Sequence, residues 1–219
     1  MIYPDKFIRY AEESNLIIPI GYWVIENVCK PIGQWNRMGL EYDKVAVNIS
    51  GIQLQSNFTD DVEKIIARTD INPEQLEFEI TETFLMKSLD QPVTQLNNLR
   101  ALGASLAIDD FGVGYSSFSQ LKQLKTHCLK IDKSFVDNIV SDDDDKAIVA
   151  AIIALGKTLN MVITAEGVET LEQFSLLREL GWRKAQGYYF AKPQAADEIA
   201  TLYHSLNTLL NQPRGFSKK

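Results

Sequence analysis

The sequence predicts an α/β fold in which about six parallel strands and the helices between them form an incomplete (β/α) barrel. Six short apolar runs each stop at a polar or charged residue, and segments of helical pattern separate these runs. Strands that alternate with helices indicate right-handed crossovers and a parallel sheet. Six strands do not close the usual eight-stranded barrel, and the chain starts with helices. We therefore expect one domain over residues 1–210, incomplete at its N-terminus, followed by a polar tail over 211–219.

The strands are expected where aliphatic and polar residues alternate. Successive side chains of a strand point to opposite faces, so Asn48 and Glu79 face inward if Val47 and Phe78 face covering helices. Active sites of (β/α) barrels lie where the strands end. The strands are expected over 45–48, 77–82, 105–108, 129–132, 162–166 and 184–187. The inward polar residues near their ends are Asn48, Glu79, Asp109, Lys130, Glu166 and Gln186.

Helical patterns precede and separate these strands. Pro19 is expected to break the chain between the first two helices, and Gly103 and Gly181 are expected to end two later ones. The acidic run 142–145 is interpreted as a solvated loop whose charges favour the next helix N-terminus, rather than as a metal site. The helices are expected over 7–15, 21–35, 60–69, 88–102, 146–159, 170–180 and 195–210.

Two adjacent carboxylates, Asp109 and Asp110, follow the third strand and precede Gly112. Like charges this close disfavour joint ionisation unless a cation neutralises them, which favours a metal site, although an Asp pair before a turn is also typical turn chemistry. The inward residues offer oxygen atoms, the ligands that Mg²⁺ and Mn²⁺ prefer. His127 and His204 lie away from the strand ends, which argues against a zinc or iron site built on imidazole.

The composition excludes several classes of protein. A net charge of −7 and a pI near 4.9 argue against binding to polymeric nucleic acid, whereas a small phosphate ligand stays compatible because bound cations reverse the local field. Cys29 and Cys128 are isolated, which fits a reducing compartment. The N-terminus has no signal-peptide pattern, and the longest apolar stretch, 147–156, is too short to span a bilayer. We therefore expect a cytoplasmic protein with no membrane segment in this chain.

Several short motifs follow one another along nearly the whole chain. They are Pro4-Asp5-Lys6-Phe7-Ile8, Ala11-Glu12-Glu13, Val47-Asn48-Ile49-Ser50, Glu79-Ile80-Thr81-Glu82, Asp109-Asp110-Phe111-Gly112, Gly114-Tyr115-Ser116-Ser117, Lys130-Ile131-Asp132, Ala165-Glu166-Gly167-Val168-Glu169 and Gln186-Gly187-Tyr188. In this order and spacing they resemble the EAL domain of bacterial cyclic di-GMP phosphodiesterases. The resemblance implies a modified triosephosphate-isomerase-type barrel that acts in second-messenger signalling.

The resemblance also implies a reaction and its cofactors. EAL domains open cyclic di-GMP to linear pGpG with two Mg²⁺ or Mn²⁺ ions. Paired metals activate a water, neutralise the phosphate and stabilise the leaving oxygen. The implied metal ligands are Asn48, Glu79, Asp109, Asp110 and Glu166, with Asp109 between the ions.

Lys130 is the residue whose role is most open to two interpretations. By resemblance it orients the attacking water and stabilises charge in the transition state. The alternative, from the residues alone, is a buried lysine that neutralises Glu77 or Asp132. Glu166 would serve both as a metal ligand and as the general base. Glu169 would support Glu166 without binding the metal itself.

Four further residues receive expected roles from the resemblance. Glu82 anchors the loop 111–117, and Gln186 contacts a metal-bound water or the substrate. Tyr115 and Tyr188 either line the site or pack in the interior.

The departure from the family lies at the N-terminus. No Glu-Ala-Leu motif precedes Met1, so we expect two strands, one metal-binding glutamate and one phosphate-contacting arginine to be missing. A chain of this kind is expected to hydrolyse cyclic di-GMP poorly or not at all. The alternatives are an inactive EAL-like module that binds cyclic di-GMP or a protein, and another Mg²⁺-dependent barrel enzyme. Besides cyclic di-GMP, the implied partners are a second copy in a homodimer and upstream sensory or GGDEF-type domains in a longer parent protein.

Overall fold

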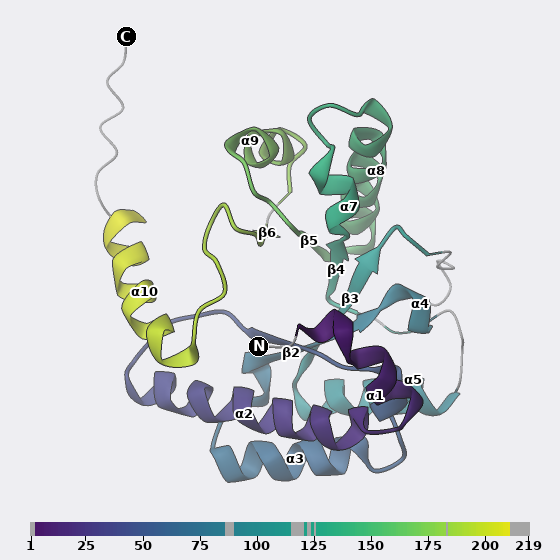
Figure 1. Ribbon diagram of the computed structural model, residues 1–219, viewed down its shortest axis with the longest axis vertical. Helices are drawn as coiled ribbons and strands as arrows, with labels where there is room; N and C mark the ends of the chain where they lie inside the picture. Colours follow the sequence, from purple (N-terminus) through teal and green to yellow (C-terminus); the bar gives the residue numbers. More distant parts are fainter. Residues whose placement is uncertain are drawn as a thin grey trace.

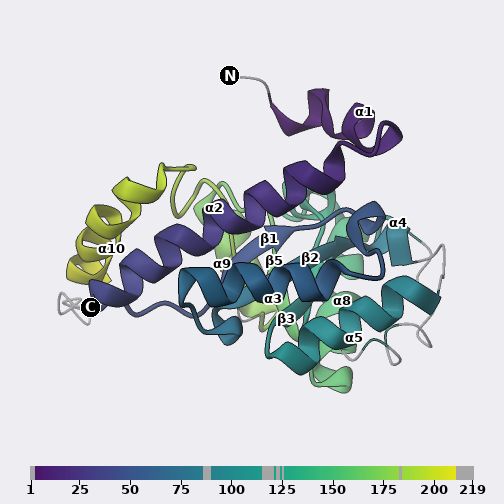
Figure 2. The same cartoon turned by 90° about the horizontal axis from the view of Figure 1, so that it is seen from below.

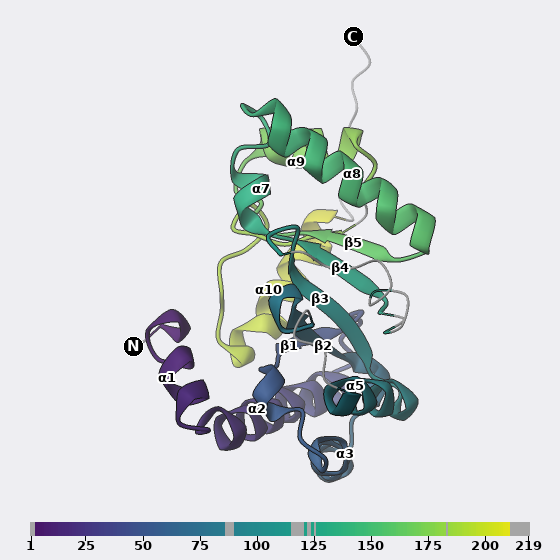
Figure 3. The ribbon, with the colours of Figure 1, turned by 90° about the vertical axis from the view of Figure 1, so that its right-hand side faces the viewer.

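Figure 1 shows the computed structural model, which describes residues 3–85, 90–114, 121, 124, 126–182 and 184–210. Within these residues, six strands form one sheet in the order β1 to β6, and all neighbouring pairs are parallel. The sheet is curled and carries helices on its outer side (Figure 3), which confirms the expected α/β fold of incomplete barrel type. The strands are β1 (Val45–Asn48), β2 (Leu76–Thr81), β3 (Ser105–Phe111), β4 (Cys128–Ile131), β5 (Val162–Ala165) and β6 (Lys184–Ala185).

The helices cover the outer face of the sheet. Helix α2 packs against β1, α5 against β3, and α8 against β4 and β5, while α3 lies between α2 and α5. The helices are η1 (Pro4–Lys6), α1 (Ile8–Glu13), α2 (Ile17–Arg37), η2 (Gly51–Gln53), α3 (Phe58–Thr69), η3 (Pro73–Gln75), α4 (Glu82–Leu85), α5 (Asp90–Leu102), α7 (Lys133–Asp137), α8 (Asp143–Leu159), α9 (Leu171–Glu179) and α10 (Ala196–Leu210). No helix in the described part of the chain combines the length and apolar character needed to cross a bilayer.

The hydrophobic core lies between the outer face of the sheet and these helices. Helix α2 contributes Ile25, Cys29 and Ile32, whose spacing of four and three residues places them on one helix face. The outward strand residues that are fully buried are Leu76, Phe78, Ile80, Leu106, Ile108, Leu129 and Ile131. The alternation read from the sequence is therefore confirmed for these strands. It leaves the inner face to smaller and polar side chains.

The first helices differ from the expectation. Helix α2 starts at Ile17, so Pro19 lies in its first turn and does not separate two helices. A backbone N–H in the first turn has no partner within the helix, and proline, which lacks this group, is therefore tolerated there. The predicted break at Pro19 is wrong.

The acidic run before α8 also differs from the expectation. Residues 143–145 form the first turn of α8 and are not a loop. Asp142 caps the helix, because its Oδ1 accepts hydrogen bonds from Asp144 N at 2.8 Å and Asp145 N at 3.2 Å. Carboxylates at this end interact favourably with the helix dipole, as the sequence indicated. The expected tail over 211–219 lies outside the described residues.

The inner side of the sheet holds a pocket of about 450 Å³. Its walls include Ala46, Glu77, Glu79, Lys130, Thr164, Ala185 and Gln186, which come from the two edge strands and from the strands between them. In the described part of the chain, β1 pairs only with β2 and β6 only with β5, so the barrel is open between β1 and β6.

Two contacts beside this opening join segments near β1 to segments near β6. Lys184 of β6 forms an ion pair with Asp43, which precedes β1. Trp35 Nε1 of α2 donates to the carbonyl oxygen of Ala196 at 3.3 Å, and α10 thereby lies beside one end of α2 (Figure 2). These contacts hold the two sides of the half-barrel together next to the opening, although no described strand fills the opening.

Candidate metal centre at the strand ends

Lys130 lies at the centre of a buried cluster of ion pairs near the C-terminal ends of the strands. Its Nζ atom is 2.6 Å from Glu79 Oε2, 3.2 Å from Asp109 Oδ1 and 2.5 Å from Glu166 Oε1. The Lys130 side chain is only 4% exposed. A buried charge is costly unless it is paired, and here Glu79 of β2, Asp109 of β3 and Glu166 directly after β5 provide the pairing. These partners differ from Glu77 and Asp132, which the sequence suggested for a structural lysine.

A β-bulge in β3 brings Asp109 and Asp110 to the same side of the sheet. The register with β4 shifts between Ile108 and Phe111, so that both aspartates oppose the single residue Lys130. Asp110 adopts a φ of 53°, in the left-handed region. Strict alternation from a strand ending at Ile108 would have separated the two carboxylates. The strand instead continues to Phe111, and the bulge allows both side chains to reach one site.

The carboxylate groups form a suitable set of metal ligands. One oxygen each of Asp109, Asp110 and Glu166 lies within 4.8 Å of the others. Together with Glu79, the cluster holds four carboxyl groups, three of which contact the ammonium group of Lys130. Oxygen donors and an excess of negative charge fit hard divalent cations such as Mg²⁺ or Mn²⁺.

The protonation properties of the cluster reflect this excess of charge. Burial, assisted by neighbouring carboxylates, raises the pKa of Asp110 to about 6. Burial also raises the pKa of Glu166 to about 7, although Lys130 opposes the change. Burial alone would lower the pKa of Lys130, but the surrounding carboxylates together raise it above its ordinary value. The cluster therefore holds a charged lysine among carboxyl groups that are costly to ionise together without a further cation.

Two expected site residues belong to the edge strands. Gln186 directly follows β6, and its Nε2 donates to Glu166 Oε1 at 2.7 Å. Asn48 ends β1, in register with Glu79 of β2, and its side chain is exposed. Both therefore lie near the cluster, on the two strands that border the opening.

Glu82 connects the start of the loop after β3 to the end of β2. Its side chain is buried, and Oε2 accepts hydrogen bonds from Gly112 N at 2.9 Å and Gly114 N at 3.0 Å. These bonds hold the backbone that directly follows Asp110. The remainder of the expected loop, 115–117, lies outside the described residues, so the anchoring of the whole loop stays a prediction.

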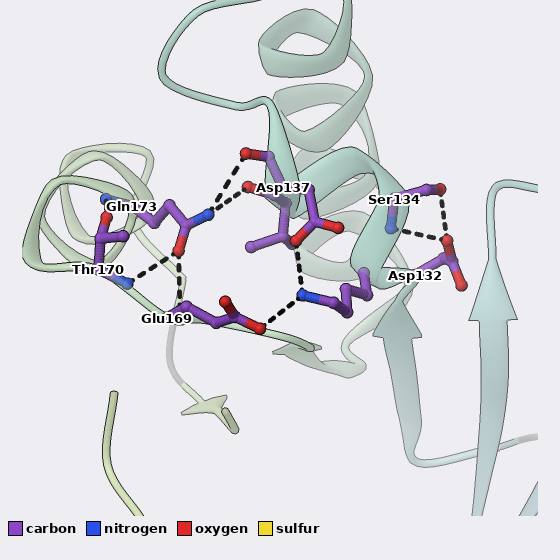
Figure 4. A network of polar contacts seen from close by, with 8 residues as sticks. Asp132, Ser134, Asp137, Glu169, Thr170 and Gln173 are labelled. Carbon is purple, nitrogen blue, oxygen red and sulfur yellow. Dashed lines mark hydrogen bonds and ion pairs between the residues drawn. The ribbon is translucent and has the colours of Figure 1, made fainter. Parts of the chain in front are cut away.

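Glu169 contacts a lysine outside the cluster. Its Oε1 accepts from Lys133 Nζ at 2.8 Å, and the same Nζ lies 2.7 Å from Asp137 Oδ1 (Figure 4). The Glu169 side chain is about half exposed. Glu169 belongs to the same loop as Glu166, and its expected role as a partner of Glu166 stays a prediction.

Four other residues considered from the sequence are exposed, lie at the other end of the sheet, or fall outside the described residues. Tyr188 is 59% exposed, so it does not pack in the interior. Tyr115 and the side chain of His204 are outside the described residues. His127 precedes β4 and lines a separate pocket at the opposite end of the sheet.

One residue that the sequence reasoning missed is Gln173. It is buried in α9 and bonds both to the loop after β5 and to α7 (Figure 4). The available signal was the spacing of Thr170 and Gln173, which is typical of a capping box.

A comparison with family models identifies the chain. The model of the EAL domain matches residues 1–193. The chain belongs to the EAL domain family. Among curated relatives, MucR of Pseudomonas aeruginosa, named a bifunctional diguanylate cyclase/cyclic di-GMP phosphodiesterase, is 40% identical over 91% of this chain. PdeR of Escherichia coli, named a cyclic di-GMP phosphodiesterase, is 37% identical over 90% of it.

Solved EAL domains share the fold. The structure of the MucR phosphodiesterase in complex with c-di-GMP has a TM-score of 0.87 at 40% identity and covers 90% of this chain and 81% of its own. The EAL domain of Mycobacterium smegmatis DcpA has a TM-score of 0.82 at 34% identity, with coverages of 91% and 87%. A manganese and cyclic di-GMP complex of Klebsiella pneumoniae BlrP1 has a TM-score of 0.69 at 31% identity, with coverages of 77% and 44%.

The curated relatives are much longer than the matched region. This EAL chain spans 29% of the length of MucR, 25% of that of E. coli DosP and 24% of that of Bacillus subtilis YkoW.

Proposed function

We propose that this EAL chain carries the catalytic residues of a phosphodiesterase that opens cyclic di-GMP to linear pGpG. The observation that supports this most strongly is the cluster of Glu79, Asp109 and Glu166 around Lys130, with Asp110 turned toward it by the bulge. The c-di-GMP complex of MucR adds support, because its fold matches this chain with a TM-score of 0.87. Relatives named cyclic di-GMP phosphodiesterases support the same reaction.

The proposed cofactors are two Mg²⁺ or Mn²⁺ ions. Such ions, when bound, activate water and neutralise charge on the phosphate and on the leaving oxygen. The manganese complex of BlrP1 supports a metal of this kind. The residues proposed to hold the ions are Asn48, Glu79, Asp109, Asp110 and Glu166.

The remaining roles in the proposed reaction belong to side chains of this EAL chain. Lys130 donates hydrogen bonds to the attacking water and stabilises negative charge on the phosphate oxygens in the transition state. Glu166 accepts the proton of that water as general base. Gln186 fixes the orientation of Glu166 through its hydrogen bond to Oε1. Glu82 holds the backbone that follows the two aspartates, and Glu169, which lies in the same loop as Glu166, pairs with Lys133.

The proposal extends to the partners of the chain. We propose a homodimer as its assembled form and the cytoplasm as its location. We also propose a longer parent protein with sensory or GGDEF-type domains. This is supported by the length of the relatives and by the names of two of them, a bifunctional diguanylate cyclase/phosphodiesterase and an oxygen sensor.

The test is product analysis after incubation with cyclic di-GMP and Mn²⁺. The protein used is an extended chain. In it, the MucR segment that precedes the region matched by this chain is fused to the N-terminus of this sequence. The extended chain should produce pGpG, as should its Asp143→Asn variant, which removes an exposed carboxylate of α8. The Asp109→Asn variant should lose about 100-fold or more in turnover.

Each contrary outcome has a distinct meaning. Binding of cyclic di-GMP to the extended chain without formation of pGpG would reject the hydrolase and favour a binding module. Equal turnover by the Asp109→Asn variant would reject the metal assignment.

A further inference from the structure

Gln173 lies where two segments that lead to the cluster meet. It is the third residue of α9 and is 6% exposed. Its Oε1 accepts hydrogen bonds from Glu169 N at 2.8 Å and Thr170 N at 3.0 Å. Its Nε2 donates to the carbonyl oxygens of Val136 at 3.1 Å and Asp137 at 3.4 Å (Figure 4). One buried amide thus bonds to the backbone of two separate segments.

A helix cap alone does not require an amide at this position. In a capping box the third residue accepts a hydrogen bond from the capping residue, and glutamate does this as well as glutamine. Glutamate is moreover favoured by the helix dipole at this end. Only glutamine can also donate to the two carbonyl groups of α7. The amide of Gln173 therefore serves a contact that capping leaves unexplained.

The two bonded segments lie close in sequence to the central residues of the cluster. Helix α7 begins three residues after Lys130 of β4, with only Ile131 and Asp132 between them. The loop after β5 carries Glu166 three residues before Glu169. Lys130 Nζ and Glu166 Oε1 lie 2.5 Å apart. A shift of the loop relative to α7 would change this distance directly.

Other contacts between the same segments are weaker or depend on the same alignment. The ion pair of Lys133 with Glu169 joins half-exposed side chains, so water and salt screen it. Gly167 packs on Lys133 so closely that an ideal Cβ would lie 2.3 Å from Lys133 Cγ. The loop continues to β6 through the hydrogen bond from Val168 N to Gln186 O at 3.0 Å. The loop start is also tied to β4 by the hydrogen bond from Glu166 N to Ile131 O at 3.2 Å. Among the described side-chain contacts between the far end of the loop and α7, the amide of Gln173 is the buried one.

We propose that Gln173 is a positioning residue, which fixes the loop after β5 against α7 and thereby sets the distance between Glu166 and Lys130. The proposal rests on the proposed function for its catalytic consequence. Catalysis is sensitive to shifts of about 1 Å in the positions of reacting groups, which can cost about 100-fold in rate. A loosened loop should therefore lower kcat while leaving KM nearly unchanged.

The experiment compares two substitutions in the same capping box. Gln173→Glu keeps the shape and the acceptor but removes the donor to α7, whereas Thr170→Ala removes the hydroxyl that accepts from Gln173 N at 3.2 Å. Thr170→Ala weakens the cap of α9 and leaves the contact to α7, whereas Gln173→Glu keeps the cap and breaks the contact to α7. In the extended chain, Gln173→Glu should lower kcat about tenfold or more, and Thr170→Ala should leave it within about twofold.

Hydrogen exchange of the metal-free 219-residue chain gives a readout that does not depend on hydrolysis. In Gln173→Glu, amides of 166–170 should exchange faster than in the wild-type chain and in Thr170→Ala. If Gln173→Glu does not fold, Gln173→Met replaces it. Methionine also removes the acceptor for Glu169 N and Thr170 N, so the exchange of this variant is compared at 166–168 only. Similar exchange and similar kcat in the glutamine and threonine variants would overturn the proposal. A wild-type extended chain without activity would overturn only the proposed function, because the exchange comparison would still decide the role of Gln173.

Discussion

Lys130 balances only part of the negative charge that surrounds it. Three carboxylates contact its Nζ, and Asp110 lies close to two of them. A buried pair of opposite charges offsets its own desolvation only when the geometry is favourable, and surplus carboxylates add repulsion. The site therefore carries an unfavourable electrostatic energy that a divalent cation would remove.

This imbalance predicts opposite effects of one substitution with and without metal. Asp109→Asn keeps the side-chain shape and removes one of the repelling charges. Without metal, its free energy of unfolding should equal or exceed that of the wild-type chain. Mn²⁺ at 100 times its Kd should stabilise the wild-type chain by about 2.7 kcal/mol, and most of this gain should disappear in Asp109→Asn. Thermal unfolding with and without Mn²⁺ measures both effects.

The Asp143→Asn variant is the control for this measurement. It removes a carboxylate from the exposed first turn of α8 and should respond to Mn²⁺ like the wild-type chain. An equal gain from Mn²⁺ in the Asp109→Asn variant would show that the metal binds elsewhere.

Removal of the lysine should have the converse effect on the metal-free protein. Lys130→Ala leaves the neighbouring carboxylates unpaired, which should lower the free energy of unfolding by about 3–5 kcal/mol. Mn²⁺ should restore part of this loss. In the extended chain, kcat and kcat/KM should both fall about 100-fold or more, because the lysine acts mainly in the transition state. Normal turnover of the Lys130→Ala variant, measured below its unfolding temperature, would show that Lys130 has only a structural role.

Among the structural elements, the strands were the most predictable from sequence and the contacts between loops the least. The alternation of aliphatic and polar residues revealed which face of each strand is buried. It did not reveal the bulge, because the left-handed φ of Asp110 depends on the pairing of β3 with β4. Short helix α7 was missed because its five residues carry too little periodicity to be recognised.

The parts of the site that sequence could not predict are those formed by long-range contacts. The residue types and their positions at strand ends followed from the motifs. The amide contacts of Gln173 join residues 36 and 37 positions apart, and no local pattern indicates such a pairing. The resemblance likewise predicted that Glu169 is a partner of Glu166, whereas the described contact of the Glu169 carboxylate is with Lys133.

The hydrogen bonds of Glu82 allow a test at the level of the loop after β3. Glu82→Ala removes the acceptor for the N–H groups of Gly112, which is exposed, and of Gly114, which is half-buried, and each lost hydrogen bond should cost about 0.5–1.5 kcal/mol. The loop beside Asp110 should loosen, and Mn²⁺ affinity should fall about tenfold in calorimetric titration. Glu82→Gln keeps an oxygen acceptor and should lose clearly less. Unchanged affinity in Glu82→Ala would show that the loop does not position the ligands.

At the scale of the whole molecule, the described half-barrel is open between β1 and β6. The pocket on its inner side borders both edge strands, and unpaired strand edges expose backbone groups to water or to other chains. A substrate in this pocket would be enclosed on fewer sides than in a closed barrel, and the metal ligands on the edge strands would be less rigidly held.

The openness of the barrel predicts weak activity of the 219-residue chain by itself. With Mn²⁺, it should convert cyclic di-GMP to pGpG at least tenfold more slowly than the extended chain, because a misplaced ligand or substrate costs at least about this factor in rate. Chromatography of the products measures both rates. Equal rates would show that the described half-barrel holds a complete site.

The central claim, that the strand-end carboxylates around Lys130 form a metal centre, is tested most directly by anomalous diffraction from crystals grown with Mn²⁺. The expected result is anomalous density between the carboxylates of Asp109, Asp110 and Glu166. The acidic turn at 143–145 provides an internal comparison, because it is equally negative but exposed and should show no such density. Density at that turn with none beside Asp109 would contradict the claim.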